Sequence, residues 1–394
     1  MFTITRVPNL SPGLQDDMDC DLALVNGQVV NSETGKVESA DVAVTRGRIV
    51  GISRERGRYQ GARTIDLTDA YVTPALVDGH VHCFQNIGVG GLHPDRIGVR
   101  QGVGAVVDAG SFGPHTVDGF REYVVRTAST RVFGLINISR WGKSSDPGEA
   151  EIIGFMQPGE VVRAIARNAD WVRGVKVRAA ANTVGALGVT PVRLAKQAAR
   201  EAGVPLVVHV GAAPPTLEEI CPILTSGDVI THCFHGKVGG LFTRESGLLP
   251  AVADALARGV VLDVGHGAKG FDWDTAEMGF ALGVRPTSIS SDLTRACVDG
   301  PVYSLATTLA KFLYLGMPLV DVIRAATLAP ARLFGLDPEF GRIAEGGPAN
   351  LSILAVVDRA VDLYDSGRVA RRAERTIEAR HTILDGVVFE ADLT

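Results

Sequence analysis

VDGHVHCF, residues 77–84, carries two histidines at the end of a short apolar run. In a β-strand, His80 and His82 project to the same face while Val81 points to the opposite one. Gly79 and the Cys83–Phe84 pair indicate a strand that runs out into a loop at this point. A histidine pair of this kind also occurs in purely structural strands, so its meaning depends on what the rest of the chain places beside it.

Seven further apolar runs of similar length follow along the chain, many of them rich in β-branched residues. They are GVGAVVDAG (102–110), RVFGLIN (131–137), VRGVKVR (172–178), VPLVVHV (204–210), DVITHCF (228–234), VVLDVG (260–265) and TSISSDL (287–293). Segments with helical patterning separate them, such as PVRLAKQAAREAG at residues 191–203. This alternation predicts an α/β fold of the (β/α)8 type, a TIM-like barrel of parallel strands.

The chain is longer than one barrel needs, since it has 394 residues and such a barrel takes about 250. Both ends alternate apolar and polar positions, as in DLALVNGQVV (21–30) and RTIEARHTILDGVVFE (375–390). Neither end holds enough strand to be stable alone. We therefore predict a small β-sandwich domain built from residues 1–72 and 340–394, beside a barrel domain that spans residues 73–339.

Charge and composition argue against several classes of partner. The formal net charge is -5, and Lys and Arg are scattered along the chain, which disfavours nucleic acid or an anionic membrane. No apolar run approaches the roughly 18 residues of a membrane span, and prolines and acids interrupt residues 1–19 where a secretion signal needs an apolar core. The five cysteines are dispersed without CxxC spacing. We expect a cytoplasmic protein with a small-molecule partner, and a homo-oligomer stays open.

Lys176, in RGVKVRAA (173–180), lies on a predicted strand between Val175 and Val177. Because those valines should face the surrounding helices, Lys176 and Arg178 should point into the barrel mouth. A buried ammonium is costly, so the pKa of Lys176 should fall. Two interpretations stay open: a lysine that reacts with carbon dioxide to form a metal-bridging carbamate, and an ion pair with a neighbouring carboxylate.

Three more polar residues end apolar runs, namely His209 in PLVVHVG, His232 in DVITHCF and Asp292 in TSISSDL. Either histidine alone would be read as an ordinary core residue. Together with the pair at the first strand, however, they gather four imidazoles at strand ends, and neutral imidazole and carboxylate are ligands that suit Zn²⁺. Asp292 is predicted to be both a ligand and a proton acceptor, although SSDLT also reads as a helix N-cap.

With these residues the chain resembles the amidohydrolase superfamily, and within it the dihydroorotase-like amidohydrolase/deacetylase metallohydrolases. The resemblance extends along essentially the whole chain, through GVGAVVDAGSFG, LINISRWG, PLVVHVG and SSDLT. It implies two divalent metal ions, expected to be Zn, with Mn, Co or Fe as alternatives. The ligands it implies are His80, His82 and Asp292 for the more buried ion, His209 and His232 for the other, and a carbamate of Lys176 that bridges both together with a hydroxide.

The resemblance also implies hydrolysis of an amide or ester bond in a small molecule. It favours deacetylation of an N- or O-acetylated carboxylic acid, with Asp292 as general base and acid. Cys83 and Phe84 follow His82, where dihydroorotase is expected to have an arginine, so dihydroorotate is not the expected substrate. Ring opening of another cyclic amide, imide or lactone is the alternative. Deamination and a non-catalytic scaffold of the dihydropyrimidinase-related type fit less well, because Lys176 and every other ligand type are present.

Two residues are candidates for substrate binding. Arg178 shares the face of Lys176 and offers a planar fork suited to a carboxylate, with a salt bridge at the barrel rim as the alternative. His266 lies between Gly265 and Gly267 in the predicted loop after the seventh strand. Those glycines let the backbone approach a ligand closely, and the alternative for His266 is a hydrogen bond that stabilises the loop.

Overall fold

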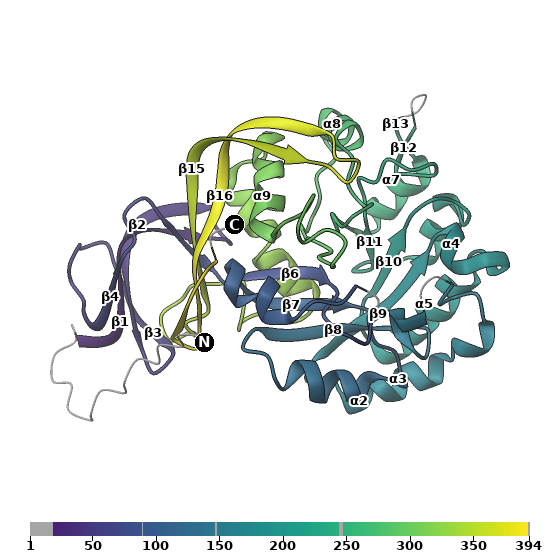
Figure 1. Cartoon of the computed structure of the whole chain (residues 1–394), viewed down its shortest axis with the longest axis horizontal. Helices are drawn as coiled ribbons and strands as arrows, with labels where there is room; N and C mark the ends of the chain where they lie inside the picture. The colour runs from purple at the N-terminus through teal and green to yellow at the C-terminus, as the bar shows by residue number, and fades with distance from the viewer. Residues whose placement is uncertain (1–18, 89, 146–147, 244–246, 393–394) are drawn as a thin grey trace.

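The computed structural model describes residues 19–88, 90–145, 148–243 and 247–392, and a barrel and a smaller sheet lie side by side in it (Figure 1). Within those ranges, seven parallel strands follow one another around the barrel in chain order. They are β6 (Leu76–Val81), β7 (Val103–Ala109), β8 (Arg131–Asn137), β9 (Val172–Ala179), β10 (Leu206–Val210), β11 (Val229–Thr231) and β14 (Val261–Asp263). The predicted α/β barrel is confirmed.

The eighth predicted strand, residues 287–293, is reduced to isolated bridges. Ser288 pairs in parallel with Asp263 of β14, and Leu293 pairs in parallel with Val81 of β6, so the segment joins the two ends of the sheet and closes the ring. Ser288 and Ser290 also donate their hydroxyls to Asp263. Asp292 then takes a left-handed backbone conformation, with φ 47°.

Helices with one apolar face cover the strands. In α3 (Pro158–Arg167), Pro158 occupies the first turn and the buried residues Val161, Ala164 and Ile165 recur at helical spacing. The helix α5 (Thr190–Ala202) likewise has Pro191 in its first turn and buried residues on one face.

The other helices are α1 (Pro94–Ile97), α2 (Val117–Phe120), α4 (Ala181–Val184), α6 (Leu217–Ile220), α7 (Pro250–Ala257), α8 (Trp273–Ala281), α9 (Leu305–Tyr314), α10 (Leu319–Ala325) and α11 (Leu328–Leu333). Short 3-10 and π turns are η1 (Val99–Gln101), η2 (Arg121–Val125), η3 (Gly142–Ser145), η4 (Ile153–Phe155), η5 (Gly185–Leu187) and η6 (Cys221–Ile223). None of the helices in the described ranges is long and apolar enough to cross a bilayer.

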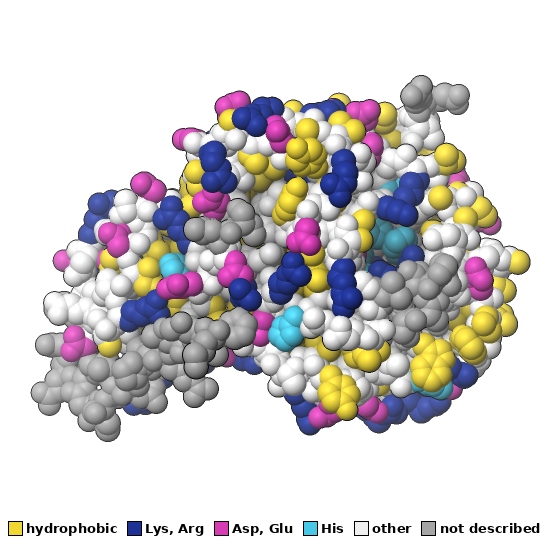
Figure 2. Space-filling model, viewed as in Figure 1, with side chains coloured by type: hydrophobic (Ala, Val, Ile, Leu, Met, Phe, Trp, Pro, Cys, Tyr) yellow, Lys and Arg dark blue, Asp and Glu magenta, His cyan; other side chains and the backbone are white. Residues whose placement is uncertain are grey.

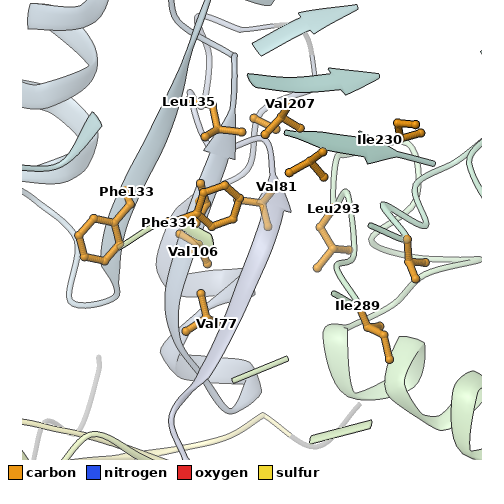
Figure 3. Packing of buried hydrophobic residues seen from close by; sticks show 14 of the residues in the cluster. Val77, Val81, Val106, Phe133, Leu135, Val207, Ile230, Ile289, Leu293 and Phe334 are labelled. Carbon is orange, nitrogen blue, oxygen red and sulfur yellow. The ribbon is translucent and has the colours of Figure 1, made fainter. Parts of the chain in front are cut away.

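The barrel is a packed core and not a pore. Val77, Val106, Leu135 and Val207 belong to one buried cluster that spans the strands, and Phe334, just after α11, packs among them (Figure 3). Burial of this kind on every strand is the main driving force for closing the sheet. It also makes the strand ends a rigid platform for polar side chains.

Both ends of the described chain contribute to the smaller mixed sheet, as predicted. Its strands are β1 (Asp19–Asn31), β2 (Lys36–Thr45), β3 (Arg48–Ser53), β4 (Gln60–Asp66), β5 (Tyr71–Pro74), β15 (Leu351–Tyr364), β16 (Ala370–Leu384) and β17 (Val387–Glu390). The antiparallel pairing of β5 with β15 joins the two halves, and Leu22 and Val42 share a hydrophobic cluster with Ile353 and Ile383. Residues 1–18 lie outside the described residues, and the domain limits given above stay a prediction. A separate two-residue pair, β12 (Phe242–Thr243) and β13 (Gly247–Leu248), lies in the loop before α7.

The hairpin formed by β15 and β16 leaves the small sheet and arches over the barrel toward α8 (Figure 1). At its tip, Ser366 donates its backbone N–H to Phe271 O at 2.9 Å. The Ser366 hydroxyl donates to Gly267 O at 3.0 Å and accepts from Phe271 N at 3.1 Å. Trp273 donates its indole N–H to Val369 O at 3.0 Å. The hairpin tip therefore holds the loop that follows β14.

Candidate active site

His80 lies near the carboxyl end of β6 and His82 directly follows that strand. Both side chains are buried. His80 Nδ1 lies 2.9 Å from Thr231 Oγ1, and His82 Nδ1 lies 2.8 Å from Ser111 Oγ. These contacts leave the two Nε2 atoms facing Asp292. Because burial lowers the pKa of both imidazoles well below the usual value, the rings are neutral and each offers a lone pair.

Asp292 reaches the same point from the segment that closes the barrel. Its Oδ1 atom lies 3.6 Å from His80 Nε2 and 3.4 Å from His82 Nε2. Oδ1 is buried, and it has no hydrogen-bond partner among the described residues. Burial raises the pKa of Asp292, whereas Lys143 and Lys176 lower it. A buried carboxylate oxygen aimed at two imidazole lone pairs is suited to receive a cation or a proton.

Lys176 projects from β9 toward the same point, as predicted from its neighbours. Its Nζ atom lies 3.3 Å from His80 Nε2, and the side chain is fully buried. Its stem lies against Gly110, where a Cβ would come within 2.9 Å of the Lys176 Cγ. Burial lowers the pKa of the Lys176 amine, which favours the neutral form that can react with carbon dioxide.

His209 and His232 form a second group beside the first. His209 Nδ1 lies 2.8 Å from His232 Nε2, and the ring centroids of His80 and His232 are 5.1 Å apart. His232 Nδ1 must donate to Gly265 O, 2.6 Å away, because a carbonyl only accepts, so His232 Nε2 carries a lone pair. Burial lowers the pKa of both rings well below the usual value. The structure therefore brings all six predicted ligands to one place.

Buried acids that the sequence analysis did not single out support these side chains. Asp263 accepts from Thr231 Oγ1 at 2.6 Å, and Thr231 in turn contacts His80. Asp108 accepts from the backbone N–H groups of Cys83 at 2.8 Å and Ser111 at 2.7 Å, which fixes the loop after β6 and the partner of His82. Both acids end apolar runs, and that position was the signal that could have identified them.

The donor set fits a divalent metal centre. Ligand atoms of His80, His82 and Asp292 all lie within 4.8 Å of one another. The polar groups behind the rings hold them in fixed tautomers, an arrangement that usually accompanies metal-bound histidines. The number of ions, their identity and the carbamate on Lys176 stay predictions.

A cavity of about 650 Å³ opens above these residues, within the range of small-molecule sites. Figure 2 shows histidine side chains at the floor of a hollow on the right of the view, with Lys and Arg side chains beside them. His209 and Asp292 line the cavity together with Arg178. Three lysines that were not predicted also line it, namely Lys143, Lys237 and Lys269. Each lies in a loop that follows a barrel strand, the position from which catalytic loops of such barrels arise.

The two substrate-contact candidates have different surroundings. Arg178 lines the cavity and also pairs with the buried Glu149, with 3.1 Å between Nη1 and Oε2. His266 is fully buried, stacks on Phe271 and does not line the cavity. Its Nδ1 donates to Gly267 O at 2.9 Å, and its Nε2 lies 2.7 Å from Lys311 Nζ. The structure thus places His266 behind the site, in the loop-stabilising arrangement named above as the alternative.

Known proteins resemble this chain in sequence and in fold. A sequence model of the amidohydrolase family matches residues 71–381. The chain belongs to the amidohydrolase family. This amidohydrolase is 36% identical over 379 residues to a deacetylase of Enterococcus faecalis, an alignment that covers 95% of this chain and 100% of the relative. It is therefore a hydrolase, as the resemblance predicted.

Two solved structures resemble the amidohydrolase closely over its length. A structure described as an adenine deaminase has a TM-score of 0.88 and 35% identity, and covers 94% of this chain and 100% of its own. A structure described as a dihydroorotase has a TM-score of 0.88 and 31% identity, and covers 94% of this chain and 98% of its own. The similarity therefore includes the small sheet as well as the barrel.

Proposed function

We propose that this amidohydrolase is a metal-dependent deacetylase that removes the acetyl group from an N- or O-acetylated carboxylic acid. The observation that carries the proposal is the buried Asp292 carboxylate, whose Oδ1 faces the imidazoles of His80 and His82 at the floor of a cavity that Arg178 also lines. The similarity to a deacetylase of Enterococcus faecalis supports the choice of acyl group.

The ligands in this proposal are the six residues brought together at the strand ends. The group near His80 would comprise His82 and Asp292, the second group would comprise His209 and His232, and Lys176 as a carbamate would lie between them. Divalent ions bound there, expected to be Zn, would lower the pKa of a water molecule and polarise an acyl carbonyl. No covalent enzyme nucleophile is then needed.

The residues of the chain supply proton transfer and orientation. Asp292 accepts the proton from the attacking water and delivers it to the leaving amine or alcohol, a role that burial favours by raising its pKa. Thr231 and Ser111 keep His80 and His82 in one orientation each. Arg178, paired with Glu149, lines the cavity, and in this proposal it binds the carboxylate of the substrate.

The test is product release by zinc-loaded protein prepared with bicarbonate, followed by ¹H NMR, which detects acetate from open-chain compounds and the opened product from cyclic ones. One panel contains open-chain acetylated acids, and the other contains cyclic amides, imides and lactones, with adenine included for deamination. Turnover of the open-chain compounds, slowed by roughly 10²- to 10⁴-fold in Asp292→Asn, is the expected result. Turnover confined to the cyclic compounds would replace this proposal by ring opening, the alternative to which the dihydroorotase-like structure is relevant.

A further inference from the structure

Cationic side chains from different barrel loops converge on the cavity. Lys143 follows β8, Arg178 lies at the end of β9, Lys237 follows β11 and Lys269 follows β14, and all of them line the same cavity. Asp292 is the acidic residue in that lining. Because the cations come from separate loops, their convergence arises from the fold and not from a basic run in the sequence.

The backbone holds two of these lysines in place. Lys143 donates its backbone N–H to Gly110 O at 3.1 Å, directly after Gly142, which has φ 68° and packs on the backbone of Phe112. Lys237 donates its backbone N–H to His235 Nδ1 at 3.2 Å. The side chain of Lys237 is also partly buried. These hydrogen bonds therefore hold the backbone of Lys143 and Lys237 in fixed turns at the cavity wall.

The charges are not balanced within the described residues. Arg178 has the carboxylate of Glu149 at 3.1 Å, whereas no carboxylate of the described chain forms an ion pair with Lys143, Lys237 or Lys269. Burial lowers the pKa of Lys237, the neighbouring charges of Lys269 and Arg178 lower it further, and Asp292 raises it. Like charges gathered in a half-enclosed space are unfavourable unless an anion joins them.

We propose that the substrate carries a second anionic group in addition to the carboxylate that Arg178 binds. That group is a second carboxylate or a phosphate, and Lys143, Lys237 and Lys269 bind it. The acyl part of this substrate class rests on the proposed function, but binding of the dianion does not. The lysines then determine specificity at the mouth of the site, while the ligands below them determine the reaction.

The experiment compares matched pairs of acetylated compounds on the zinc-loaded enzyme. N-acetylaspartate is paired with N-acetylasparagine, and N-acetyl-O-phosphoserine is paired with N-acetylserine, so that each pair differs by the second anion. Wild-type enzyme should show a higher kcat/KM for at least one dianion than for its partner, by roughly 10- to 100-fold, the usual effect of a charge-assisted hydrogen bond. Lys143→Met, Lys237→Met and Lys269→Met should each reduce that preference, measured as the ratio of kcat/KM for the dianion to kcat/KM for its singly charged partner.

Lys36→Met is the matched control, because Lys36 is an exposed lysine at the start of β2 in the small sheet. Circular dichroism and zinc content verify that each variant is folded and loaded. Calorimetric titration of zinc-loaded Asp292→Asn with the same compounds measures binding without turnover. Lysine-dependent binding of a dianion without hydrolysis of any acetyl compound would support this inference and contradict the proposed function. Hydrolysis with no preference for a dianion, or a preference that survives every lysine substitution, would overturn this inference alone.

Discussion

Asp292 combines three properties at one residue: a strained backbone with φ 47°, a largely buried carboxylate with 17% of its side chain exposed, and a buried Oδ1 without a hydrogen-bond partner among the described residues. Gly267 makes room for it, since a Cβ at that position would collide with the Asp292 carboxylate. Strain of this kind is retained where the surrounding structure requires it, commonly at catalytic sites.

Asp292→Asn should therefore slow turnover while zinc still binds at saturating concentration. The amide cannot accept the proton of the attacking water, so we expect kcat to fall by roughly 10²- to 10⁴-fold. Metal analysis of the dialysed protein and initial rates provide the measurement. Asp299→Asn, at an exposed residue that pairs with Arg96, is the control. An unaltered kcat in the zinc-loaded Asp292→Asn variant would exclude the proton-transfer role.

Lys176 should carry a carbamate when metal is present. Its buried, neutral amine is the reactive form, and its position 3.3 Å from His80 Nε2 places the product between the two histidine groups. Reconstitution with zinc and ¹³C-bicarbonate should give a protein-bound carbamate signal in ¹³C NMR. The signal should be lost in Lys176→Met and in protein treated with a chelator. If enzyme reconstituted with zinc and ¹³C-bicarbonate is active but shows no such signal, Lys176 is an unmodified buried amine.

The convergence of the six candidate ligands could be predicted because each lies in or directly after an apolar run, and a strand end is recognisable from sequence. Their supports were less visible, since Thr231 and Asp263 lie on the adjacent strands β11 and β14, whereas His80 lies on β6 at the other end of the sheet order. The surroundings of His266 were also not readable from the sequence. The glycines around it indicated a close backbone approach, but its ring faces Lys311 of α9, a pairing that no local pattern reveals.

At the scale of elements, the barrel alternation was readable for the seven described strands, whereas the eighth segment pairs only at isolated bridges. Backbone hydrogen bonds such as Val264 N–H to Ser288 O and Asp292 N–H to His80 O hold it, and the hydroxyls of Ser288 and Ser290 add bonds to Asp263. The clamp formed by the hairpin tip was not predicted, because the strand pattern of residues 351–384 does not indicate how far the hairpin extends from its sheet.

Ser366→Ala should loosen the loop after β14. The substitution leaves Gly267 O and Phe271 N without the Ser366 hydroxyl, at a cost of roughly 1–3 kcal/mol to the local structure. Because Gly265 O orients His232, we expect faster amide exchange in residues 265–272 and zinc affinity reduced by several-fold to tenfold. Glu374→Ala, at an exposed position on β16, is the control. Unaltered exchange and zinc affinity in Ser366→Ala would show that the clamp is passive.

For the molecule as a whole, Lys311 links the barrel, the loop after β14 and the segment before α9. It is fully buried, and its Nζ contacts His266 Nε2 at 2.7 Å and Pro301 O at 3.0 Å. Burial lowers the pKa of Lys311 to about 7. A neutral amine has two N–H groups, and these contacts use both.

The buried amine should make stability depend on pH. The unfolded chain keeps Lys311 protonated up to about pH 10, whereas the folded protein releases that proton above about pH 7. The buried charged amine therefore destabilises the fold fully below pH 7. As pH rises above 7, the free energy of unfolding increases by at most about 1.4 kcal/mol per pH unit. Urea unfolding between pH 6.5 and 9 should show this slope in wild type and its loss in Lys311→Met. Equal slopes would mean that Lys311 stays charged in the fold.

The arrangement of the hairpin has a consequence for biosynthesis. A ribosome that has translated the whole barrel has not yet produced Ser366, so the loop beside His232 and Asp292 emerges without its clamp. β1 must likewise wait for residues more than 300 positions downstream before its sheet is complete. Nascent chains stalled before β15 should consequently bind zinc more weakly than released ones, and the late hairpin would delay metal capture until translation has passed it.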